Sequence, residues 1–439
     1  MKTFNKSHWQ GTHYAYRHFR CLQAVSAQGA RGLHSRNTKT GGDRMMFDVK
    51  QEQSNGYTFL GLFSGAGGLD LGFSKAGFVH TESSDILPYA VETMRRNRPE
   101  WDVRCQDVRD YTPSFRRDLD VLLAGFPCQG FSLGGNRDAS DERNQLYRHV
   151  VRIANIMKPR VVVMENVLNL RTMIHPATGK PFADQIAEEM AEIGYTTRFQ
   201  FFRVAGYGVP QTRRRFIFIA YRGDTLAHYA FPQPGRETTI RDFIYDLGQN
   251  TTIQLPNHDP QWGFDSYVHT ETHEPFDPAE EVVPVRFSRT ASEGTPIRTF
   301  DSPFPAVDTA TVWGWAQGNV KATRIDKQRQ AGDALFVRNP DSRARLWRVS
   351  ASRLRPFTAR EYARLQTFPD SWEFTGQNKR EVQLQIGNAV PVVFAKRIAM
   401  SVAEALEVAD GRRKKQSGMM EMLLFPVMSY NSETNTTNH

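Results

Sequence analysis

Residues 58–73 read TFLGLFSGAGGLDLGF, a short apolar run that leads into a glycine-rich turn and then into a helical pattern. The run Thr58–Phe63 predicts a buried strand, and the glycines after it let a ligand approach the backbone closely. The turn departs from the G-x-G-x-x-G pattern, because Asp70 stands where the third glycine would fall. It therefore favours a nucleoside-type ligand over a dinucleotide pyrophosphate. For this segment alone, a plain tight turn stays open.

The alternation of apolar runs and helical patterns continues on both sides of this turn. Four further runs predict strands: Phe78–Thr81, which leads toward Asp85, and Val121–Ala124, Val161–Met164 and Phe216–Ala220. Helical patterns cover Asn144–Met157, Thr358–Thr367 and Pro391–Val408. Strand, loop and helix in alternation predict an α/β fold with a mostly parallel sheet.

A second domain interrupts the first. The alternation stops after Phe231, and residues 232–350 are rich in Pro and Arg and contain Trp313-Gly314-Trp315. We interpret them as a smaller, irregular, β-rich domain with the tryptophan pair in its core. The expected parts are a basic extension (1–56), a first domain (57–231), the insert (232–350), a return segment that completes the first domain (351–410) and a polar tail (411–439).

Composition excludes several classes of protein. Of 439 residues, 39% are hydrophobic and 23% are charged, as in ordinary globular proteins. No apolar run reaches the roughly 18 residues that a membrane-spanning helix needs. The 3 cysteines exclude a disulfide scaffold and indicate a reducing compartment.

The net charge of +9 suggests a polyanionic partner. Much of this charge lies in residues 1–56, which carry nine basic against three acidic residues. A solvated tail is the favoured interpretation of this segment. A basic arm on nucleic acid and a true start at Met45 or Met46 remain open.

Acidic residues follow two of the predicted strands. Asp85 lies at a distance from the turn where a carboxylate can accept both hydroxyls of a ribose, although a surface acid would explain Asp85 alone. Asp107 ends the next short segment and could accept a hydrogen bond from an adenine amino group.

The segment Gly125-Phe126-Pro127-Cys128 places a thiol on the loop after a central strand. A nucleophile is favoured there over a buried structural thiol, because the carboxyl ends of parallel strands line the ligand crevice. Glu165 follows another strand and should share that pocket. Alternation along an extended segment should place Gln211, Arg213 and Arg215 on one side, which suits an anionic or carbonyl-bearing target. Taken alone, a solvated basic turn explains these three residues better.

In their order along the chain, these motifs resemble those of the cytosine-C5 DNA methyltransferases of bacterial restriction-modification systems. The resemblance rests on six segments: residues 63–73, 125–132, 165–167, 211–215, 360–370 and 385–391. They imply a Rossmann-like S-adenosylmethionine-dependent methyltransferase domain and a target-recognition domain in the insert. In this family the last motif folds back beside the cofactor loop.

The resemblance also implies site residues. The catalytic set would be Cys128, Glu165, Arg213 and Arg215. The cofactor-binding set would be Phe63, Gly65, Ala66, Gly68, Asp85, Ile86, Asp107, Val108, Gly125, Pro127, Asn388 and Ala389, with Glu82 competing with Asp85 for the ribose. No metal is expected.

The expected reaction methylates C5 of a cytosine that has been flipped out of double-stranded DNA. Cys128 would add to C6, and Glu165 would donate a proton toward N3. Arg213 would stabilise charge at O2, supported by Arg215. The stretch 132–144 would close as a lid, and arginines of the insert would contact phosphates and guanines.

We further expect a monomer without membrane attachment in the bacterial cytoplasm, associated with the nucleoid. A cognate restriction endonuclease acting on the same site is also expected. Three alternatives are a tRNA cytosine-C5 methyltransferase, a catalytically silent DNA-binding relative and a nicotinamide oxidoreductase. The missing third glycine argues against the oxidoreductase.

Overall fold

The structure is a computed structural model that describes residues 48–114, 118–127, 142–223, 229–250, 252–259, 276–277, 279–286, 299–309, 313–325, 346–350 and 353–413. All of them belong to one compact unit, Met45–His439. The expected nucleophile Cys128 and most of the expected lid lie outside the described residues. Within the described ranges, no helix has both the length and the apolar character needed to cross a membrane.

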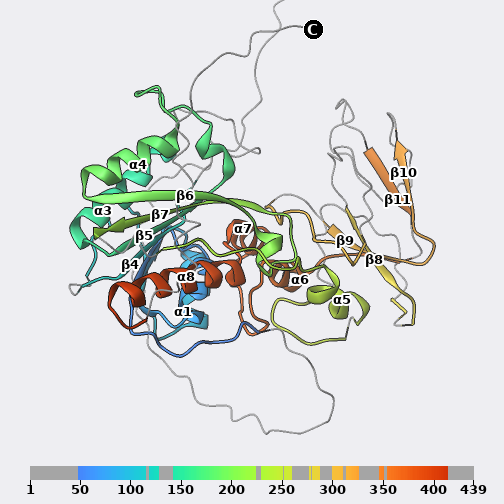
Figure 1. Ribbon diagram of the computed structural model, residues 1–439. Helices are drawn as coiled ribbons and strands as arrows, with labels where there is room; N and C mark the ends of the chain where they lie inside the picture. Colours follow the sequence, from blue (N-terminus) through green and yellow to red (C-terminus); the bar gives the residue numbers. More distant parts are fainter. Residues whose placement is uncertain are drawn as a thin grey trace, which may run out of the picture. The chain divides into compact units, whose positions relative to one another are not determined.

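A seven-stranded sheet lies at the centre of this unit (Figure 1). Its strands, in spatial order, are β3 (Val103–Cys105), β2 (Val79–Asp85), β1 (Thr58–Leu62), β4 (Val121–Ala124), β5 (Val161–Asn166), β7 (Arg214–Arg222) and β6 (Tyr195–Arg203). The first five run parallel, and β7 is antiparallel to both β5 and β6. The predicted α/β class with a mostly parallel sheet is confirmed.

Both faces of the sheet are buried, which explains why the central strands are apolar without a break. In β4, Val121 and Leu123 point into one hydrophobic core, whereas Leu122 and Ala124 point into the other. Side chains of β5 divide between the same two cores in the same alternation.

Helices cover the two faces as separate layers (Figure 1). The core of one face contains α1 (Gly68–Lys75) and α8 (Val392–Ala409), and that of the other contains α3 (Tyr147–Met157) and α4 (Phe182–Glu192). The short helix α2 (Pro88–Asn97) packs beside β3. The helix predicted from Asn144 begins at Tyr147, because residues 142–145 form a 3₁₀ turn.

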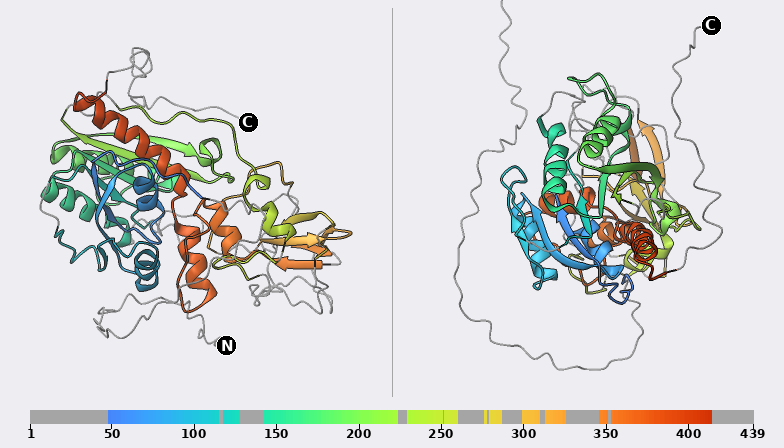
Figure 2. Two further views of the ribbon diagram at one scale, coloured as in Figure 1. Left: turned by 90° about the horizontal axis from the view of Figure 1, so that it is seen from below. Right: turned by 60° about the vertical axis from the view of Figure 1, so that its left-hand side comes forward.

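Helix α8 comes from the far end of the chain and lies directly on α1 (Figures 1 and 2). Two glycines of α1 make this approach possible. A Cβ on Gly68 would come within 2.3 Å of the Val390 carbonyl oxygen, and a Cβ on Gly72 within 2.3 Å of Ala395 Cβ. Any larger residue would push the helices apart. The structure thus confirms that the last motif folds back beside the glycine loop.

A third hydrophobic core combines elements of the insert with the return segment. Its elements are α5 (Arg241–Gln249), the antiparallel strands β8 (Val282–Arg286) and β9 (Trp313–Gln317), and the helices α6 (Ala359–Leu365) and α7 (Lys379–Asn388). Strand β12 (Arg353–Pro356) pairs antiparallel with β9 in the same sheet. Strands β10 (Lys321–Ile325) and β11 (Leu346–Ser350) form a separate antiparallel pair. Trp313 and Trp315 are buried in this core, as predicted.

Candidate active and cofactor-binding site

The carboxyl ends of four parallel strands meet at one edge of the sheet. In the register of the sheet, Leu62 of β1 lies beside Ser84 of β2 and Ala124 of β4, and Ala124 lies beside Met164 of β5. Every segment that follows these strands therefore opens on the same edge. Such an edge is where open α/β sheets bind their ligands.

The glycine-rich loop leaves β1 in an unusual backbone conformation. Phe63 has a φ of 54°, Gly65 of 54° and Gly67 of 79°, all in the left-handed region. A non-glycine residue such as Phe63 adopts this region at a cost of about 1–2 kcal/mol. A Cβ on Gly65 would meet nothing within 4 Å, so the loop backbone is open on that side. The side chain of Ala66 is buried in the third core, which also contains residues of the insert, and Gly68 starts α1.

Asp85 holds this loop from the end of β2. Its Oδ2 accepts a hydrogen bond from the Gly65 N–H (2.7 Å), and its Oδ1 accepts one from the Leu87 N–H (2.9 Å). Burial raises the pKa of Asp85, and these backbone donors oppose that shift. Each carboxylate oxygen retains a further lone pair for a hydroxyl donor. The predicted ribose contact is therefore chemically open to Asp85.

Glu82, the competing acid, lies elsewhere in the sheet. Its carboxylate accepts hydrogen bonds from the Tyr111 hydroxyl and from the backbone and hydroxyl of Ser114, and it forms an ion pair with Arg104. These four donors come from β3 and the segment after it. Glu82 thus ties β2 to β3 and to the segment after it, and among the described residues none of these polar contacts reaches the glycine loop.

The predicted adenine contacts divide between side chains at the surface and in the core. Ile86 is half-buried beside Cys105, whose Sγ lies 3.9 Å from the Ile86 carbonyl oxygen. The carboxylate of Asp107 accepts hydrogen bonds from the backbone and guanidinium of Arg109. Burial would raise the pKa of Asp107, but these contacts outweigh it and lower the pKa. The side chain of Val108 points into the core, so that only its backbone could face a ligand.

Gly125 follows β4 and lies close to the glycine loop, and Pro127 comes directly before Cys128 in the sequence. The Gly125 N–H donates to the Leu62 carbonyl at 3.3 Å, and a Cβ on Gly125 would meet only Phe63 O, at 3.6 Å. Pro127 is half-buried. Asn388 is exposed at the end of α7.

Next to Asn388, Ala389 packs against the loop helix. Its Cβ lies 3.3 Å from the position of a Cβ on Gly68.

Glu165 is the second-last residue of β5, and Arg215 of β7 lies beside it. The two side chains form an ion pair through Arg215 Nε, and Glu165 is only 8% exposed. Burial raises the pKa of Glu165, although the charge and contact of Arg215 act to lower it. The adjacent Asn166 donates from Nδ2 to the Phe126 carbonyl at 3.2 Å. This bond ties the end of β5 to the segment that leads to Cys128.

Arg213 has different surroundings from Arg215. Its Nη1 donates to the carbonyls of Val307 (2.8 Å) and Gly387 (3.0 Å), so that it joins the insert to α7. The neighbouring Gln211 also makes long-range contacts. Its Nε2 donates to the Leu365 carbonyl and to Gln366 Oε1, and its Oε1 accepts from the Val307 N–H. Strand β7 begins only at Arg214, so strand alternation does not apply to residues 211–213. The structure brings Arg215, and not Arg213, to Glu165.

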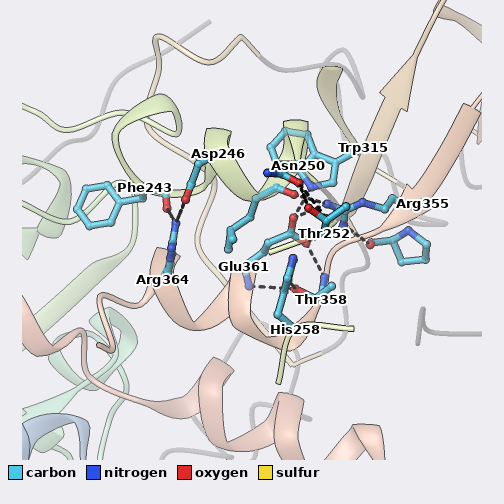
Figure 3. Close-up of polar contacts among 12 residues, drawn as sticks. Phe243, Asp246, Asn250, Thr252, His258, Trp315, Arg355, Thr358, Glu361 and Arg364 are labelled. Carbon is cyan, nitrogen blue, oxygen red and sulfur yellow. Dashed lines mark hydrogen bonds and ion pairs between the residues drawn. The ribbon is translucent and has the colours of Figure 1, made fainter. Parts of the chain in front are cut away.

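Sequence reasoning missed a buried polar cluster around α6 (Figure 3). Glu361 accepts hydrogen bonds from both Nη atoms of Arg355, from Trp315 Nε1 and from the Thr358 N–H. Burial alone would raise the pKa of Glu361, but Arg355 and the other donors lower it. Thr358 caps α6 by accepting from the Glu361 N–H, and it also bonds His258 Nδ1 at 2.8 Å. The capping-box pattern Thr358-x-x-Glu361 is the sequence signal that could have revealed this cluster.

Arg364 and Arg360 continue the polar contacts of α6. Arg364 binds Asp370 in a bidentate pair at 2.7 Å and also binds Asp246 of α5 (Figure 3). Arg360 is fully buried and donates to three backbone carbonyls, those of Pro256, Pro369 and Trp372. Helix α6 therefore joins α5 of the insert to β12 and to the residues that follow α6 through charged side chains.

No cluster of potential metal ligands occurs among the residues that the structure describes. A family model for the C-5 cytosine-specific DNA methylase matches residues 57–404. The Type II methyltransferase M.Eco47II of Escherichia coli is 31% identical over 376 residues, covering 83% of each chain. The Type II methyltransferase M.NgoMIV of Neisseria gonorrhoeae is 28% identical over 353 residues, covering 80% of this chain and 98% of that protein.

A solved DNA modification methyltransferase encoded within an E. coli prophage shares the fold. It superposes with a TM-score of 0.53 at 21% identity and covers 80% of this chain and 100% of that one.

Proposed function

The chain belongs to the C-5 cytosine-specific DNA methylase family. We therefore propose that the site at the carboxyl edge of its sheet methylates C5 of a cytosine that is flipped out of a specific duplex sequence. The enzyme is an S-adenosylmethionine-dependent DNA cytosine-5 methyltransferase of the restriction-modification type. The observation that carries the mechanism is the buried Glu165–Arg215 pair, which Asn166 links to the segment before Cys128.

Cys128 is the nucleophile of the proposed reaction. Its thiolate forms a bond to C6 of cytosine, and the displaced electron pair makes C5 nucleophilic while negative charge develops on N3 and O2. After C5 has gained the methyl group, a base removes the C5 proton and the bond from C6 to sulfur breaks, which releases the thiolate. A thiol suits this step because a few per cent of it is ionised near pH 7 even at an ordinary pKa of about 8.5.

Glu165 protonates N3 in this scheme. Burial raises its pKa, so a larger fraction of the carboxyl group holds a proton near neutral pH than in water. A neutral carboxyl can donate this proton as charge builds on the ring.

We propose that Arg215 stabilises the negative charge that develops at O2. This reverses the expectation from the sequence, which gave that role to Arg213 and a supporting role to Arg215. Arg215 is the arginine that contacts Glu165, whereas Arg213 holds the insert against α7. We therefore expect Arg215→Lys to slow methyl transfer about tenfold or more, because one fixed donor at a developing charge contributes that much. Arg213→Lys should act mainly on stability. Equal rate losses in both variants, at equal stability, would contradict this reversal.

The residues at the loop fit S-adenosylmethionine, which when bound supplies an electrophilic methyl group. The open side of Gly65 leaves room beside the loop backbone. Asp85 would hold the ribose hydroxyls, Ile86 would pack on the adenine, and Asp107 would accept from the adenine amino group. Asn388 would contact the ligand from the end of α7.

The insert, residues 232–350, would read the DNA sequence, with arginines on phosphates and guanine edges. Affinity for DNA should then fall steeply as salt rises. We further propose a monomer that acts on nucleoid DNA in the bacterial cytoplasm, alongside an endonuclease that cuts the same site.

Covalent trapping tests the proposed mechanism. Duplex DNA with 5-fluorocytosine in its candidate sites cannot lose a proton from C5, so the wild-type enzyme with S-adenosylmethionine should form a covalent complex that survives denaturing electrophoresis. Cys128→Ala should form none.

Incubation with S-adenosylmethionine that carries a tritiated methyl group, together with either DNA or tRNA, shows which nucleic acid is methylated. Label in tRNA alone would overturn the proposal. Cofactor binding without transfer to either substrate would indicate a silent relative.

A further inference from the structure

Asp70 is a buried carboxylate beneath the glycine loop that the proposed mechanism does not use. It lies in the first turn of α1 and is 1% exposed. Burial raises its pKa to about 6, and the negative charge of Asp85 adds to that shift. Within the described part of the chain, its side chain contacts hydroxyl groups and forms no ion pair.

Two serines hold this carboxylate in place. Asp70 Oδ1 accepts a hydrogen bond from Ser64 Oγ (3.0 Å) and a second from Ser83 Oγ (2.7 Å). Ser83 thereby uses its one proton, so the contact between Ser83 Oγ and His80 Nε2 (2.8 Å) must be donated by the histidine. The hydrogen bonds therefore run from His80 to Ser83 and from Ser83 to Asp70. Asp70 therefore accepts hydrogen bonds from both the loop, through Ser64, and β2, through Ser83.

Gly61 of β1 leaves the space that this arrangement needs. A Cβ at Gly61 would lie 2.0 Å from Asp70 Oδ1, 2.6 Å from Ser64 Oγ and 2.9 Å from Ser83 Oγ. These distances are far shorter than any van der Waals contact, so no other residue could stand there without breaking the network.

Asp70 and Asp85 together hold two successive residues of the loop. Asp70 binds Ser64 through the hydroxyl, and Asp85 binds Gly65 through the backbone N–H. The residues on either side of Ser64 have left-handed backbones, which need support from outside the loop to persist. Two carboxylates on two different elements supply that support.

We propose that Asp70 is a positioning residue for the cofactor site, which holds Ser64 and hence the glycine loop in the conformation that receives S-adenosylmethionine. This inference rests on the proposed function, because it takes the loop as the cofactor site. The residue acts through Ser64 and does not touch the ligand.

The test measures the dissociation constant for S-adenosylhomocysteine by calorimetry, in the absence of DNA and of turnover. Asp70→Ala should weaken binding about tenfold to a hundredfold, the range for loss of a hydrogen bond to a charged group. Asp70→Asn retains one oxygen that can accept from both serines, and it should restore most of the affinity. Ser64→Ala should weaken binding in the wild type and have no further effect in Asp70→Ala.

Asp410→Asn is the matched control. Asp410 accepts from Arg160 and Tyr57 at the end of α8, so this variant should lower the melting temperature and leave the dissociation constant unchanged. If Asp70→Ala does not fold, Ser64→Ala and Ser83→Ala carry the test, and each should weaken binding by at least about threefold.

Wild-type affinity in Asp70→Ala, or equal effects of Ser64→Ala with and without Asp70, would overturn the inference. Absence of binding by the wild type would instead overturn the proposed function.

Discussion

Two buried carboxylate–arginine pairs in this enzyme have opposite properties. The carboxylates Glu165 and Glu361 are both nearly inaccessible to solvent, yet burial raises the pKa of Glu165 while the pKa of Glu361 is lowered. The difference lies in the donors. Glu361 accepts from a bidentate arginine, an indole and a backbone N–H, whereas Arg215 is the polar partner of Glu165 within the described residues.

This difference separates structural from reactive carboxylates. A carboxylate with four donors stays ionised and cannot give up or take a proton near neutral pH, so it can only hold elements together. A buried carboxylate with one donor can hold a proton and release it.

The largest expected effect concerns the rate of methyl transfer. Glu165→Gln retains the shape of the side chain but removes the acidic proton, so the single-turnover rate should fall about 10²- to 10⁴-fold. The melting temperature should change little, because the carboxylate has few partners to lose. Glu189→Gln, a change in a carboxylate that binds Tyr147 and Arg148 away from the edge, is the control and should leave the rate unchanged. A single-turnover rate for Glu165→Gln within threefold of wild type would show that Glu165 is not a reactive carboxylate and would contradict the contrast with Glu361.

The second-largest expected effect is on the free energy of unfolding. Glu361→Ala leaves the buried guanidinium of Arg355 without its counter-ion, which should cost about 3–5 kcal/mol of unfolding free energy in urea titrations. Glu280 offers a matched control, since it pairs with Arg353 in the same region but is half exposed. Glu280→Ala should cost about 1 kcal/mol or less. Similar losses in the two variants would show that burial does not decide the contribution of these pairs.

Much of the catalytic domain could be predicted from sequence because its strands are buried on both faces. Val121–Ala124 was predicted with the bounds that β4 has, and the apolar runs of β5 and β7 were equally clear. Edge strand β6 was not predicted, because its exposed outer residues include Phe199 and Phe201 and conceal the polar alternation. Helix α5 was missed inside a region interpreted as irregular strands.

The candidate site was predictable where chemistry follows a strand end, and not where it depends on long-range contacts. Asp85 and Glu165 lie at the carboxyl ends of β2 and β5, so the order of strands and helices was enough to predict that they meet at one edge of the sheet. The partners of Arg213 are carbonyls of Val307 and Gly387, more than 90 and 170 residues away, and no local pattern encodes such contacts. The same holds for Asp70, whose role depends on the space left at Gly61.

The two pairs should also respond oppositely to pH. The lowered pKa of Glu361 adds stability that is present above its ordinary pKa near 4.5 and is lost as the pH falls through the folded value. The raised pKa of Glu165 makes its ionised form a cost, so the folded state loses stability as the pH rises above 4.5 through the folded value. Relative to wild type, the stability deficit of Glu361→Gln should shrink as the pH falls below 4.5, whereas Glu165→Gln should become more stable as the pH rises above 4.5. Parallel trends in melting temperature would refute the assigned shifts.

The smallest expected effect separates a helix cap inside the α6 cluster from one outside it. Thr358 caps α6 and also bonds His258, while Asn378 caps α7 and bonds only the Glu381 N–H through its side-chain oxygen. Loss of a cap costs about 1 kcal/mol, so Asn378→Ala should lower the unfolding free energy by that amount. Thr358→Ala should cost about 2 kcal/mol, because it also leaves a buried histidine nitrogen without its partner. Equal losses in urea titrations would mean that the bond to His258 contributes nothing, and that the cluster is no more than the sum of the Glu361 contacts.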